Sequence, residues 1–360
     1  MRVAIDARSL SERNTSNRTY WSELVNALGQ RDNVELLLVS NASIAPEDVP
    51  SNATSIVVPV PGRWFSFVTL PKIAQAQRAH VVHVQYTVSP LFRIPVVTTV
   101  HDVSFFIEPT WFGTKDRFLL RTSVPAACRR AARVLAPSET CREEILAYVD
   151  VSPEKVAVTL EGTPNRLLDE PHNPTAEESI QTLVGNDPYV LLVGGASPRK
   201  NLAGAIEAVR RARRTIPTLR LLVTGTLFSK PNESWVVAPG ALDETRLAAA
   251  YRGADALLHP SFHEGFGLTI LEAMALGCPV VASDRGSIPE VAGEAALLYD
   301  PFDAEGMANG LVRLLNPAFR ADLVDRGRAR SEGFTWHETA VKTEEAYRAA
   351  ATGLSASAPS

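Results

Sequence analysis

The stretch HEGFGLTILEAMALGCPVVAS, residues 263–283, decides how the chain is expected to fold. It predicts a loop, a helix from about Leu268 to Leu276, a turn and a strand, which is one step of an alternating α/β pattern. The helix is apolar on nearly every side except at Glu272, which lies on one line with Leu268 and Leu276. A buried carboxylate needs hydrogen-bond donors or a cation. Glu272 is therefore a candidate ligand-binding residue, with an exposed helix edge or a structural salt bridge as the alternative.

Short apolar runs alternate with helical patterns on both sides of this stretch. Continuous runs of this kind suit parallel strands that are buried on both faces. The first half predicts strands in RVAIDA, ELLLVS, SIVVPV, VVHVQY, VVTTVH, RVLAPS and VAVTLEG, and the second half in YVLLVGG, LRLLVTG, WVVAPG, ALLHPS, PVVAS and ALLYD. Helices are expected at Tyr20–Leu28 and Thr140–Tyr148, the second with a capping box of Thr140 and Glu143.

This alternation predicts an α/β fold of two doubly wound, Rossmann-like domains that face an interdomain cleft. The length of 360 residues fits two domains at ~150 residues each. We expect an N-terminal domain at residues 1–165, a polar and irregular linker at 166–186, and a C-terminal domain at 187–335.

The composition argues against several classes of protein. A net charge of -4 provides no global basic field for nucleic acid. The cysteines Cys128, Cys141 and Cys278 form no C-x-x-C pair, so neither a zinc site nor a disulfide framework is indicated, and a reducing cytosol fits best. No apolar run approaches the ~20 residues of a membrane span, and MRVAIDARSL lacks the apolar core of a signal peptide. We therefore expect a cytoplasmic protein.

One segment, WFGTKDRFLLRTSVPAACRRAAR at residues 111–133, favours contact with an anionic membrane. Apolar and basic side chains together suit such a surface. They are Trp111, Phe112, Phe118, Leu119, Lys115, Arg117, Arg121, Arg129, Arg130 and Arg133. A basic helix pair that simply covers the sheet has the same composition, and the sequence leaves both interpretations open. With this contact, the chain would lie on the inner face of the cell membrane.

Glu264 follows the expected strand ALLHPS, at the strand end where ligands of such sheets bind. Its neighbours Gly265 and Gly267 let the backbone approach a ligand closely. The start of the next helix adds N–H groups and positive potential, which favour an anion. The alternative is an ordinary glycine loop whose acid is favoured by the helix dipole.

Two other sets of polar residues follow predicted strands. Arg199 and Lys200 come after VLLVGGASP, and adjacent cations at a helix start oppose its dipole. They therefore predict a bound anion, with phosphate as the natural candidate, and a solvated basic corner is the alternative. Asn201 is expected to cap the helix that follows. His101 and Asp102 follow VVTTV, and a lone histidine at such a place is more often structural than catalytic.

Several motifs are absent from the sequence. Neither G-x-x-x-x-G-K-[ST] nor G-x-G-x-x-G occurs, which argues against a P-loop NTPase and a dinucleotide oxidoreductase. No D-x-D triplet occurs, so a metal-bridged diphosphate is not indicated. His80 and His83 form H-x-x-H, but on a strand this spacing points them to opposite faces, so no metal site is predicted.

The motifs resemble a known family. HEGFGLTILEAMALGCPVVASDRGSIPEVAGEAALLYDP resembles the signature of family-4 retaining glycosyltransferases with the GT-B fold, in which Glu264 and Glu272 form the E-x7-E pair. ASPRKNLAGAIEAV resembles the phosphate-binding segment of that family, and LDETRLAAAYRGADALLHPS the stretch before the signature. RVAIDAR, VVHVQY and VVTTVHDVSFFIEPTWF resemble the mannosyl- and rhamnosyltransferase branch of bacterial polysaccharide assembly. FTWHETAVKTEEAYRAA resembles the C-terminal helix, so residues 336–360 would form a helix that crosses back to the first domain, followed by a tail.

The resemblance implies a nucleotide sugar donor and a role for each matching residue. Arg199 and Lys200 would hold the donor diphosphate. Glu272 would bind the ribose hydroxyls, so that its partners arrive with the ligand. Glu264 and His101 would contact the donor sugar as the catalytic residues. Backbone N–H groups would reach sugar and phosphate from Gly265, Phe266, Gly267 and Leu268.

The early loop departs from the branch pattern, which places glycines before an Arg-x-Tyr. RNTSNRTY keeps Arg18 and Tyr20 without a glycine. Together with Asp102, these two residues are assigned to the acceptor side, where the crowded loop would alter acceptor geometry. Gly195 stands where some relatives carry an arginine, which leaves more of the phosphate charge to the two cations.

These features together predict a metal-independent, retaining glycosyltransferase that uses no cofactor. It would transfer a hexose from a nucleoside diphosphate sugar, with GDP-mannose suggested by the branch resemblance, to a saccharide or lipid-linked acceptor. The leaving phosphate would take the acceptor proton in a front-face displacement, while the protein positions the reactants and stabilises leaving-group charge. The alternatives are a non-catalytic nucleotide-sugar-binding subunit of a glycosylation complex and a nucleotide-sugar epimerase of the same fold.

Overall fold

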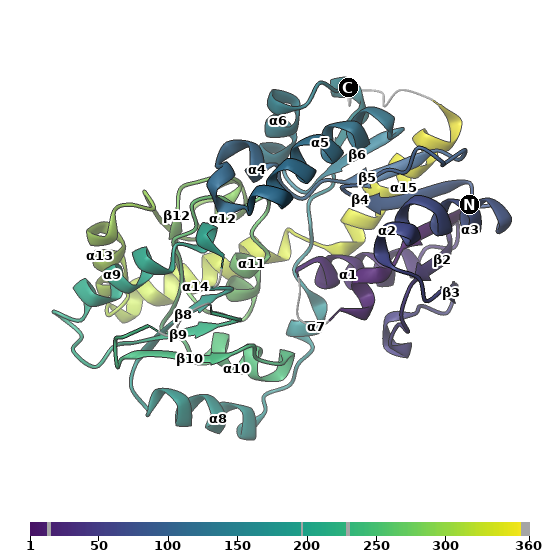
Figure 1. Cartoon of the computed structure of the whole chain (residues 1–360). Coiled ribbons are helices and arrows are strands. Elements are labelled where there is room, and N and C mark those ends of the chain that lie inside the picture. Colours follow the sequence, from purple (N-terminus) through teal and green to yellow (C-terminus); the bar gives the residue numbers. More distant parts are fainter. Residues whose placement is uncertain (13–15, 196, 228–230, 354–360) are drawn as a thin grey trace. The chain divides into compact units, whose positions relative to one another are not determined.

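The computed structural model describes residues 1–12, 16–195, 197–227 and 231–353, and the chain divides into two compact units. Unit 1 comprises Met1–Gly162 and Thr335–Ser360, and unit 2 comprises Thr163–Phe334. Figure 1 labels most of the helices and strands of both units. Residues 13–15 of the early loop and 354–360 of the expected tail lie outside the described residues.

Unit 1 is built on a seven-stranded, wholly parallel sheet in the order β3-β2-β1-β4-β5-β6-β7. Its strands coincide with the apolar runs of the first half of the sequence, as predicted. They are β1 (Arg2–Asp6), β2 (Glu35–Ser40), β3 (Ala53–Val57), β4 (Val81–Gln85), β5 (Val96–Thr99), β6 (Arg133–Ala136) and β7 (Val156–Val158). Because all strands run in one direction, their carboxyl ends lie along a single edge of the sheet.

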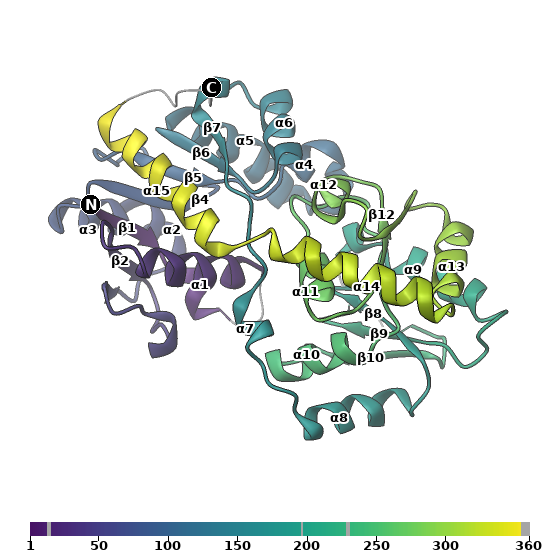
Figure 2. The ribbon, with the colours of Figure 1, turned by 180° about the vertical axis from the view of Figure 1, so that it is seen from behind.

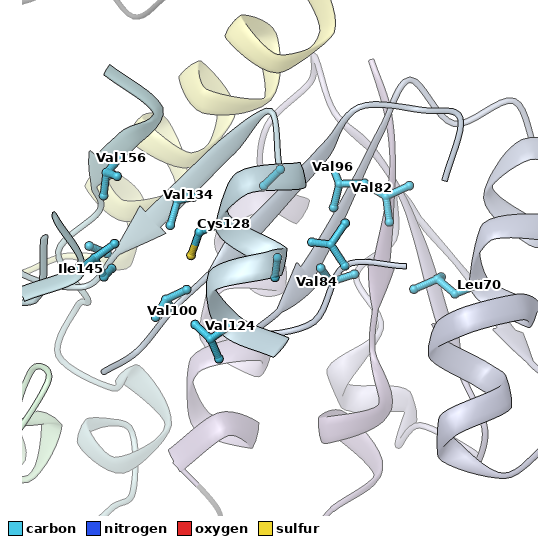
Figure 3. Packing of buried hydrophobic residues seen from close by; sticks show 14 of the residues in the cluster. Leu70, Val82, Val84, Val96, Val100, Val124, Cys128, Val134, Ile145 and Val156 are labelled. Carbon is cyan, nitrogen blue, oxygen red and sulfur yellow. The ribbon is translucent and has the colours of Figure 1, made fainter. Parts of the chain in front are cut away.

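Helices cover both faces of this sheet. They are α1 (Ser16–Gly29), α2 (Gly62–Trp64), α3 (Leu70–Ala76), α4 (Ser104–Ile107), α5 (Thr114–Arg130), α6 (Glu139–Tyr148) and α15 (Trp336–Thr352). Figure 3 shows buried side chains of α5 and α6, such as Cys128 and Ile145, against β-strand residues such as Val134. On the opposite face, α1 packs against α15, and Figures 1 and 2 both show α15 alongside β4 and β5.

A buried polar chain fixes α15 to the sheet. The ring of His83 on β4 contacts the Tyr347 hydroxyl through Nδ1 at 2.6 Å and Thr99 Oγ1 through Nε2 at 2.8 Å. Arg31 forms an ion pair with Glu344 of the same helix. Burial lowers the pKa of His83 to about 3, so the ring stays neutral and hydrogen-bonded. His83, the second histidine of the H-x-x-H pair, is thus a structural residue.

Unit 2 repeats the architecture with a six-stranded parallel sheet in the order β10-β9-β8-β11-β12-β13. Its strands are β8 (Tyr189–Val193), β9 (Arg220–Thr224), β10 (Val236–Gly240), β11 (Ala256–His259), β12 (Val280–Ser283) and β13 (Leu297–Tyr299). Its helices are α7 (Asn165–Leu168), α8 (Pro174–Val184), α9 (Leu202–Ala212), α10 (Glu244–Gly253), α11 (Leu268–Ala275), α12 (Ile288–Ala292), α13 (Ala304–Arg313) and α14 (Pro317–Glu332). The strand order reverses at β8 and β11, which marks the position where ligands of such sheets bind.

Two local expectations were wrong. The segment at 166–186 is not irregular, because α8 forms within it: Asn173 caps the helix, Pro174 begins it, and Gly185 ends it with a left-handed conformation. Its polar composition concealed buried residues at helical spacing, Ala176, Ile180 and Val184. The cap of α6 is also two residues earlier than the expected Thr140, since the Ser138 hydroxyl accepts from the Cys141 N–H at 3.0 Å.

In the ranges that the structure describes, no helix combines the length and apolarity needed to span a membrane.

Candidate active site

Glu264 lies between two cations at the carboxyl edge of the unit 2 sheet. Arg199 and Lys200 belong to η6 (Pro198–Lys200), the turn after β8, and Glu264 belongs to the loop after β11. The Lys200 Nζ lies 2.8 Å from Glu264 Oε1, and Arg199 Nη1 lies 3.0 Å from Glu264 Oε2. Asn201 caps α9 by accepting from the Gly204 N–H at 3.0 Å, as predicted. The turn therefore presents both cations at one fixed point.

The protonation of Glu264 follows from this arrangement. The residue is only 6% exposed, and burial by itself would raise its pKa. Arg199 and Lys200 outweigh burial and hold the pKa of Glu264 well below its usual range. The carboxylate is therefore ionised at neutral pH.

His259, at the end of β11, is a further contact of Glu264 that the sequence analysis missed. Its Nε2 lies 3.2 Å from Glu264 Oε1, and burial, reinforced by the charge of Lys200, lowers its pKa. A polar residue ending an apolar strand is the sequence signal that could have identified it, because ligands bind at such ends.

The loop after Glu264 presents backbone rather than side chains. Phe266 is 5% exposed and packs edge-on against Phe334, so its ring belongs to the core of unit 2. The Ser287 hydroxyl donates to the carbonyls of Glu264 and Phe266, at 3.0 and 2.6 Å. Gly267 takes a φ of +114° immediately before α11 begins at Leu268, a conformation that favours glycine. This geometry suits the predicted role of 265–268 as donors of N–H groups.

Glu272 is partly buried on α11 and already has a partner. The Tyr251 hydroxyl of α10 donates to Glu272 Oε2 at 2.6 Å. Burial raises the pKa of Glu272, and the hydrogen bond from Tyr251 together with the charge of Lys200 opposes this shift. The expectation that all its partners arrive with a ligand was therefore incomplete. Tyr251 is a second residue that the sequence analysis missed, since nothing in its spacing connects it to Glu272.

The predicted catalytic residue of unit 1, His101, lies in a separate polar chain. Its Nδ1 lies 3.2 Å from Glu161 Oε1, and its Nε2 lies 2.8 Å from Gln85 Nε2. A carboxylate can only accept, so Nδ1–H donates to Glu161 and Nε2 accepts from the Gln85 amide. Glu161 is 4% exposed and is another residue that the sequence analysis missed. These two hydrogen bonds fix both the tautomer and the orientation of the His101 ring.

The residues predicted on the acceptor side are engaged elsewhere. Tyr20 is 1% exposed, bonds Thr99 Oγ1 at 2.9 Å and lies edge-on to the His101 ring. Its burial is at odds with direct acceptor contact, because the packing of α1 turns the ring into the core. Arg18 pairs with Asp48 at 2.9 Å. Asp102 accepts from the N–H and hydroxyl of Ser104 at the start of α4. The rest of the crowded loop, at 13–15, lies outside the described residues.

Comparisons with known proteins identify the family. A family model described as "Glycosyl transferases group 1" matches residues 187–317, and one described as "Glycosyltransferase Family 4" matches residues 18–163. The O-antigen chain mannosyltransferase B of Escherichia coli is 30% identical over 287 residues, 72% of this chain and 73% of that protein. This chain belongs to the family-4 glycosyltransferases. The MMP alpha-(1->4)-mannosyltransferase of Mycolicibacterium hassiacum is 31% identical over 236 residues, 62% of this chain and 55% of that protein.

Solved structures show that the glycosyltransferase has the GT-B fold. The sucrose-phosphate synthase of Thermosynechococcus elongatus matches with a TM-score of 0.71 and 22% identity, over 97% of this chain and 98% of that chain. Anabaena HepE in complex with UDP-glucose matches with a TM-score of 0.73 and 19% identity, over 97% of this chain and 100% of that chain. At these identities the likeness concerns the fold.

The ion cluster predicts how acid affects the stability of the glycosyltransferase. Because the folded-state pKa of Glu264 is depressed, its contribution is present above the usual value of 4.5 and is lost as pH falls through the folded-state value. We expect Glu264→Gln to melt several degrees below the wild type at pH 7, with the gap closing in acid. Thermal melts from pH 7 to pH 3 measure this, with Glu207→Gln, a half-buried carboxylate on α9 that pairs with Arg210 and Arg211, as control. A gap that is independent of pH would contradict the assignment.

Proposed function

We propose that this glycosyltransferase transfers a hexose, with mannose as the first candidate, from a nucleoside diphosphate sugar to a saccharide or lipid-linked acceptor of bacterial glycan assembly. The transfer retains the anomeric configuration and requires neither metal nor cofactor. The observation that carries the proposal is the cluster of Arg199 and Lys200 around the buried Glu264, at the start of α11 and the carboxyl edge of the sheet.

This cluster suits a diphosphate. Two cations on one turn can each bond a phosphate oxygen, and the first N–H groups of α11 add positive potential. A diphosphate entering here takes over the cations from Glu264, whose carboxylate then faces the sugar. Glu272 follows on α11, and its oxygens can accept from ribose hydroxyls beside Tyr251. Within this segment, the order sugar, diphosphate, ribose thus follows the order Glu264, start of α11, Glu272.

The sugar and the acceptor are proposed from the relatives. The two mannosyltransferases described above are named for transfer of mannose, one of them for O-antigen chains. Their similarity supports mannose as the sugar and a growing glycan as the acceptor.

The chemistry is a front-face displacement. The bond from the sugar anomeric carbon to the diphosphate oxygen breaks, and the acceptor hydroxyl oxygen forms its bond on the same face. The proton of that hydroxyl moves to the departing phosphate oxygen. Arg199 and Lys200 stabilise the charge that develops on the diphosphate, and Glu264 with His101 positions the sugar.

Nucleotide binding and product stereochemistry test this proposal. We expect GDP and GDP-mannose to raise the Tm most in a panel of nucleoside diphosphates and their sugars, because binding to the folded state stabilises it. NMR of the product should then show the donor anomeric configuration, with activity that persists in EDTA. Nucleotide binding without turnover would support a binding subunit, donor conversion without acceptor an epimerase, and an inverted product would contradict retention.

The proposed function predicts that Glu161 sets the catalytically competent tautomer of His101. Glu161→Gln replaces a carboxylate by an amide that can donate to Nδ1, which would move the ring proton to Nε2. Loss of a hydrogen bond to a charged group costs ~1.5–3 kcal/mol, so we expect kcat to fall roughly tenfold to more than a hundredfold. Nucleotide Kd should stay unchanged, and Glu161→Asp should recover part of the rate. Nitrogen chemical shifts of His101 report the tautomer; an unaltered tautomer with normal kcat would refute this role.

We also propose that α5 rests on an anionic membrane surface. Val124, Ala127 and Cys128 bury one side of α5 against the sheet, while Phe118 and Leu119 are 72% and 57% exposed on the other. Lys115, Arg121, Arg129 and Arg130 are exposed on the same helix. Arg133 is 7% exposed on β6, so it must be removed from the predicted basic set. The helix therefore both covers the sheet and presents an outer face of apolar and basic side chains.

The exposed pair on α5 predicts vesicle binding. Each basic residue near an anionic surface contributes ~1 kcal/mol, and the two apolar side chains add burial in the interface. We expect co-sedimentation with vesicles of phosphatidylglycerol and phosphatidylcholine at low salt, and loss of most of it in the double variant Phe118→Ser, Leu119→Ser. Leu315→Ser, which alters a leucine of unit 2 that is 58% exposed, is the control. Equal binding to purely zwitterionic vesicles would refute the electrostatic part.

A further inference from the structure

Unit 1 contains a polar pocket whose lining includes none of the predicted site residues. It occupies about 360 Å³ at the carboxyl ends of β1, β2 and β4. Asp6, Arg8, Asn41, Gln85 and Tyr86 are among its lining residues. Tyr86 adopts a φ of +57°, which is uncommon for an aromatic residue. Such conformations concentrate at ligand-binding positions, where the surrounding structure maintains them.

The pocket adjoins the predicted sugar contact. Gln85 lines it, and the Gln85 side-chain nitrogen lies 2.8 Å from Nε2 of His101. The ring centroids of Tyr86 and His101 are 5.9 Å apart. A ligand in the pocket therefore lies one side chain away from the residue to which the proposed function assigns the donor sugar. The reactant that must meet the donor sugar is the acceptor.

The charge of the pocket indicates what kind of acceptor group fits. Arg8 binds both carboxylate oxygens of Asp6, with Nε to Oδ1 at 2.8 Å and Nη2 to Oδ2 at 2.7 Å. It also donates to the Gly62 carbonyl at 3.3 Å. Among the lining residues that the structure describes, Asp6 and Glu12 carry two negative charges against the single positive charge of Arg8. A phosphate group would meet a neutralised cation and a net negative lining.

The same lining suits an uncharged sugar. Amides at Asn41 and Gln85 and the carboxylate of Asp6 offer donors and acceptors for hydroxyl groups. The Tyr86 ring provides an apolar face for the C–H side of a sugar ring together with a polar hydroxyl. The volume is near the lower end of the ~300–1,000 Å³ typical of ligand pockets, which suits a small ligand rather than an extended one.

We propose that this pocket binds the terminal, uncharged sugar ring of the acceptor, with Tyr86 and Asn41 as specificity-determining contacts. The proposal rests on the proposed function, and it moves the acceptor site away from Arg18, Tyr20 and Asp102. The pair Asp6–Arg8 excludes phosphorylated sugars because the Arg8 guanidinium is already bound to the Asp6 carboxylate and its charge is neutralised. Neutral and phosphorylated acceptors are thus distinguished by one ion pair.

The experiment compares neutral with phosphorylated sugars. With the nucleotide site saturated by GDP, saturation-transfer NMR is recorded for the methyl glycosides of mannose, glucose and galactose, and for the three free sugar 6-phosphates. We expect the wild type to bind a neutral glycoside and to show no stronger binding to any 6-phosphate. Failure of every neutral glycoside to bind, or tighter binding of a 6-phosphate, would overturn the proposal.

Three variants locate the ligand in the pocket. Tyr86→Asn removes the ring and keeps a residue that tolerates positive φ, and Asn41→Ala removes the amide. Each should weaken glycoside binding about tenfold or more, the loss expected for one or two hydrogen bonds or ring contacts. Asp6→Asn should release Arg8 and allow a 6-phosphate to bind. Tyr148→Asn, an exposed tyrosine of the same unit, is the control.

The outcomes separate the two proposals. A wild type that binds no nucleotide, and turns over no nucleotide sugar, contradicts the proposed function. A wild type that binds nucleotide normally, with Tyr86→Asn and Asn41→Ala retaining full glycoside binding, contradicts only the acceptor pocket.

Discussion

Replacing Glu272 by alanine is expected to weaken the binding of nucleotide sugar and of free nucleoside diphosphate alike. In this variant the ribose loses its hydrogen bonds to the Glu272 carboxylate, which contribute ~1.5–3 kcal/mol. We therefore expect Kd to rise roughly tenfold to more than a hundredfold. Turnover at saturating donor should change much less, because the contact is made equally in the ground state and the transition state. Titration calorimetry with the nucleoside diphosphate, together with donor kinetics, measures both quantities.

Tyr251→Phe is the matched control for this variant. It removes the hydroxyl that donates to Glu272 Oε2 but leaves the carboxylate available to a ribose. We expect a moderate loss of stability, because the partly buried carboxylate loses its hydrogen-bond donor, with nucleotide affinity closer to wild type than in Glu272→Ala. If Glu272→Ala bound nucleotide normally and both variants lost similar stability, Glu272 would be a purely structural partner of Tyr251.

Glu264→Gln is expected to lower kcat and to retain nucleotide binding. Glu264 lies in the loop before α11, closer than Glu272 to the place assigned to the sugar, so its replacement removes a contact with the reacting group. The expected loss in kcat is again roughly tenfold to more than a hundredfold, from ~1.5–3 kcal/mol. The structure adds a reason why affinity survives: the glutamine no longer competes with a diphosphate for Arg199 and Lys200.

The loss of charge also has a cost in stability, which must be separated from the kinetic effect. Removing one partner of a buried ion pair costs roughly 3–5 kcal/mol, and water that reaches the partly exposed cations reduces this figure. Kinetics should therefore be measured well below the Tm of the variant, with Glu207→Gln as a surface control. Loss of nucleotide binding in Glu264→Gln with normal binding in Glu272→Ala would reverse the two assignments.

The sequence was sufficient to predict the strands and which residues gather at their ends. The apolar runs predicted the strands because a parallel sheet covered on both faces requires them. The positions of Arg199, Lys200 and Glu264 after two such runs predicted that they share one sheet edge, and the salt bridges confirm it. The helix within 166–186 was not predicted from the sequence, because it is short and largely polar.

Side-chain partners, by contrast, were decided by tertiary structure. Tyr251 meets Glu272, and Glu161 meets His101, because helix packing and strand order bring together residues 21 and 60 positions apart. Local periodicity carries no information on such pairings. The burial of Tyr20 is of the same kind, since the packing of α1 against the sheet and α15 decides which way the ring faces.

The sequence by itself therefore determined two parallel α/β sheets and a glycosyltransferase signature with its two glutamates and two cations. Only the tertiary structure decided that Glu264 neutralises both cations, that Glu272 already accepts from a tyrosine, and that Arg8 is bound by Asp6 beside Gln85. The physical reason is that spacing along the chain fixes backbone periodicity, which acts over a few residues. Charge neutralisation and burial depend on neighbours in space, and those are set only when the strands pair and the helices pack.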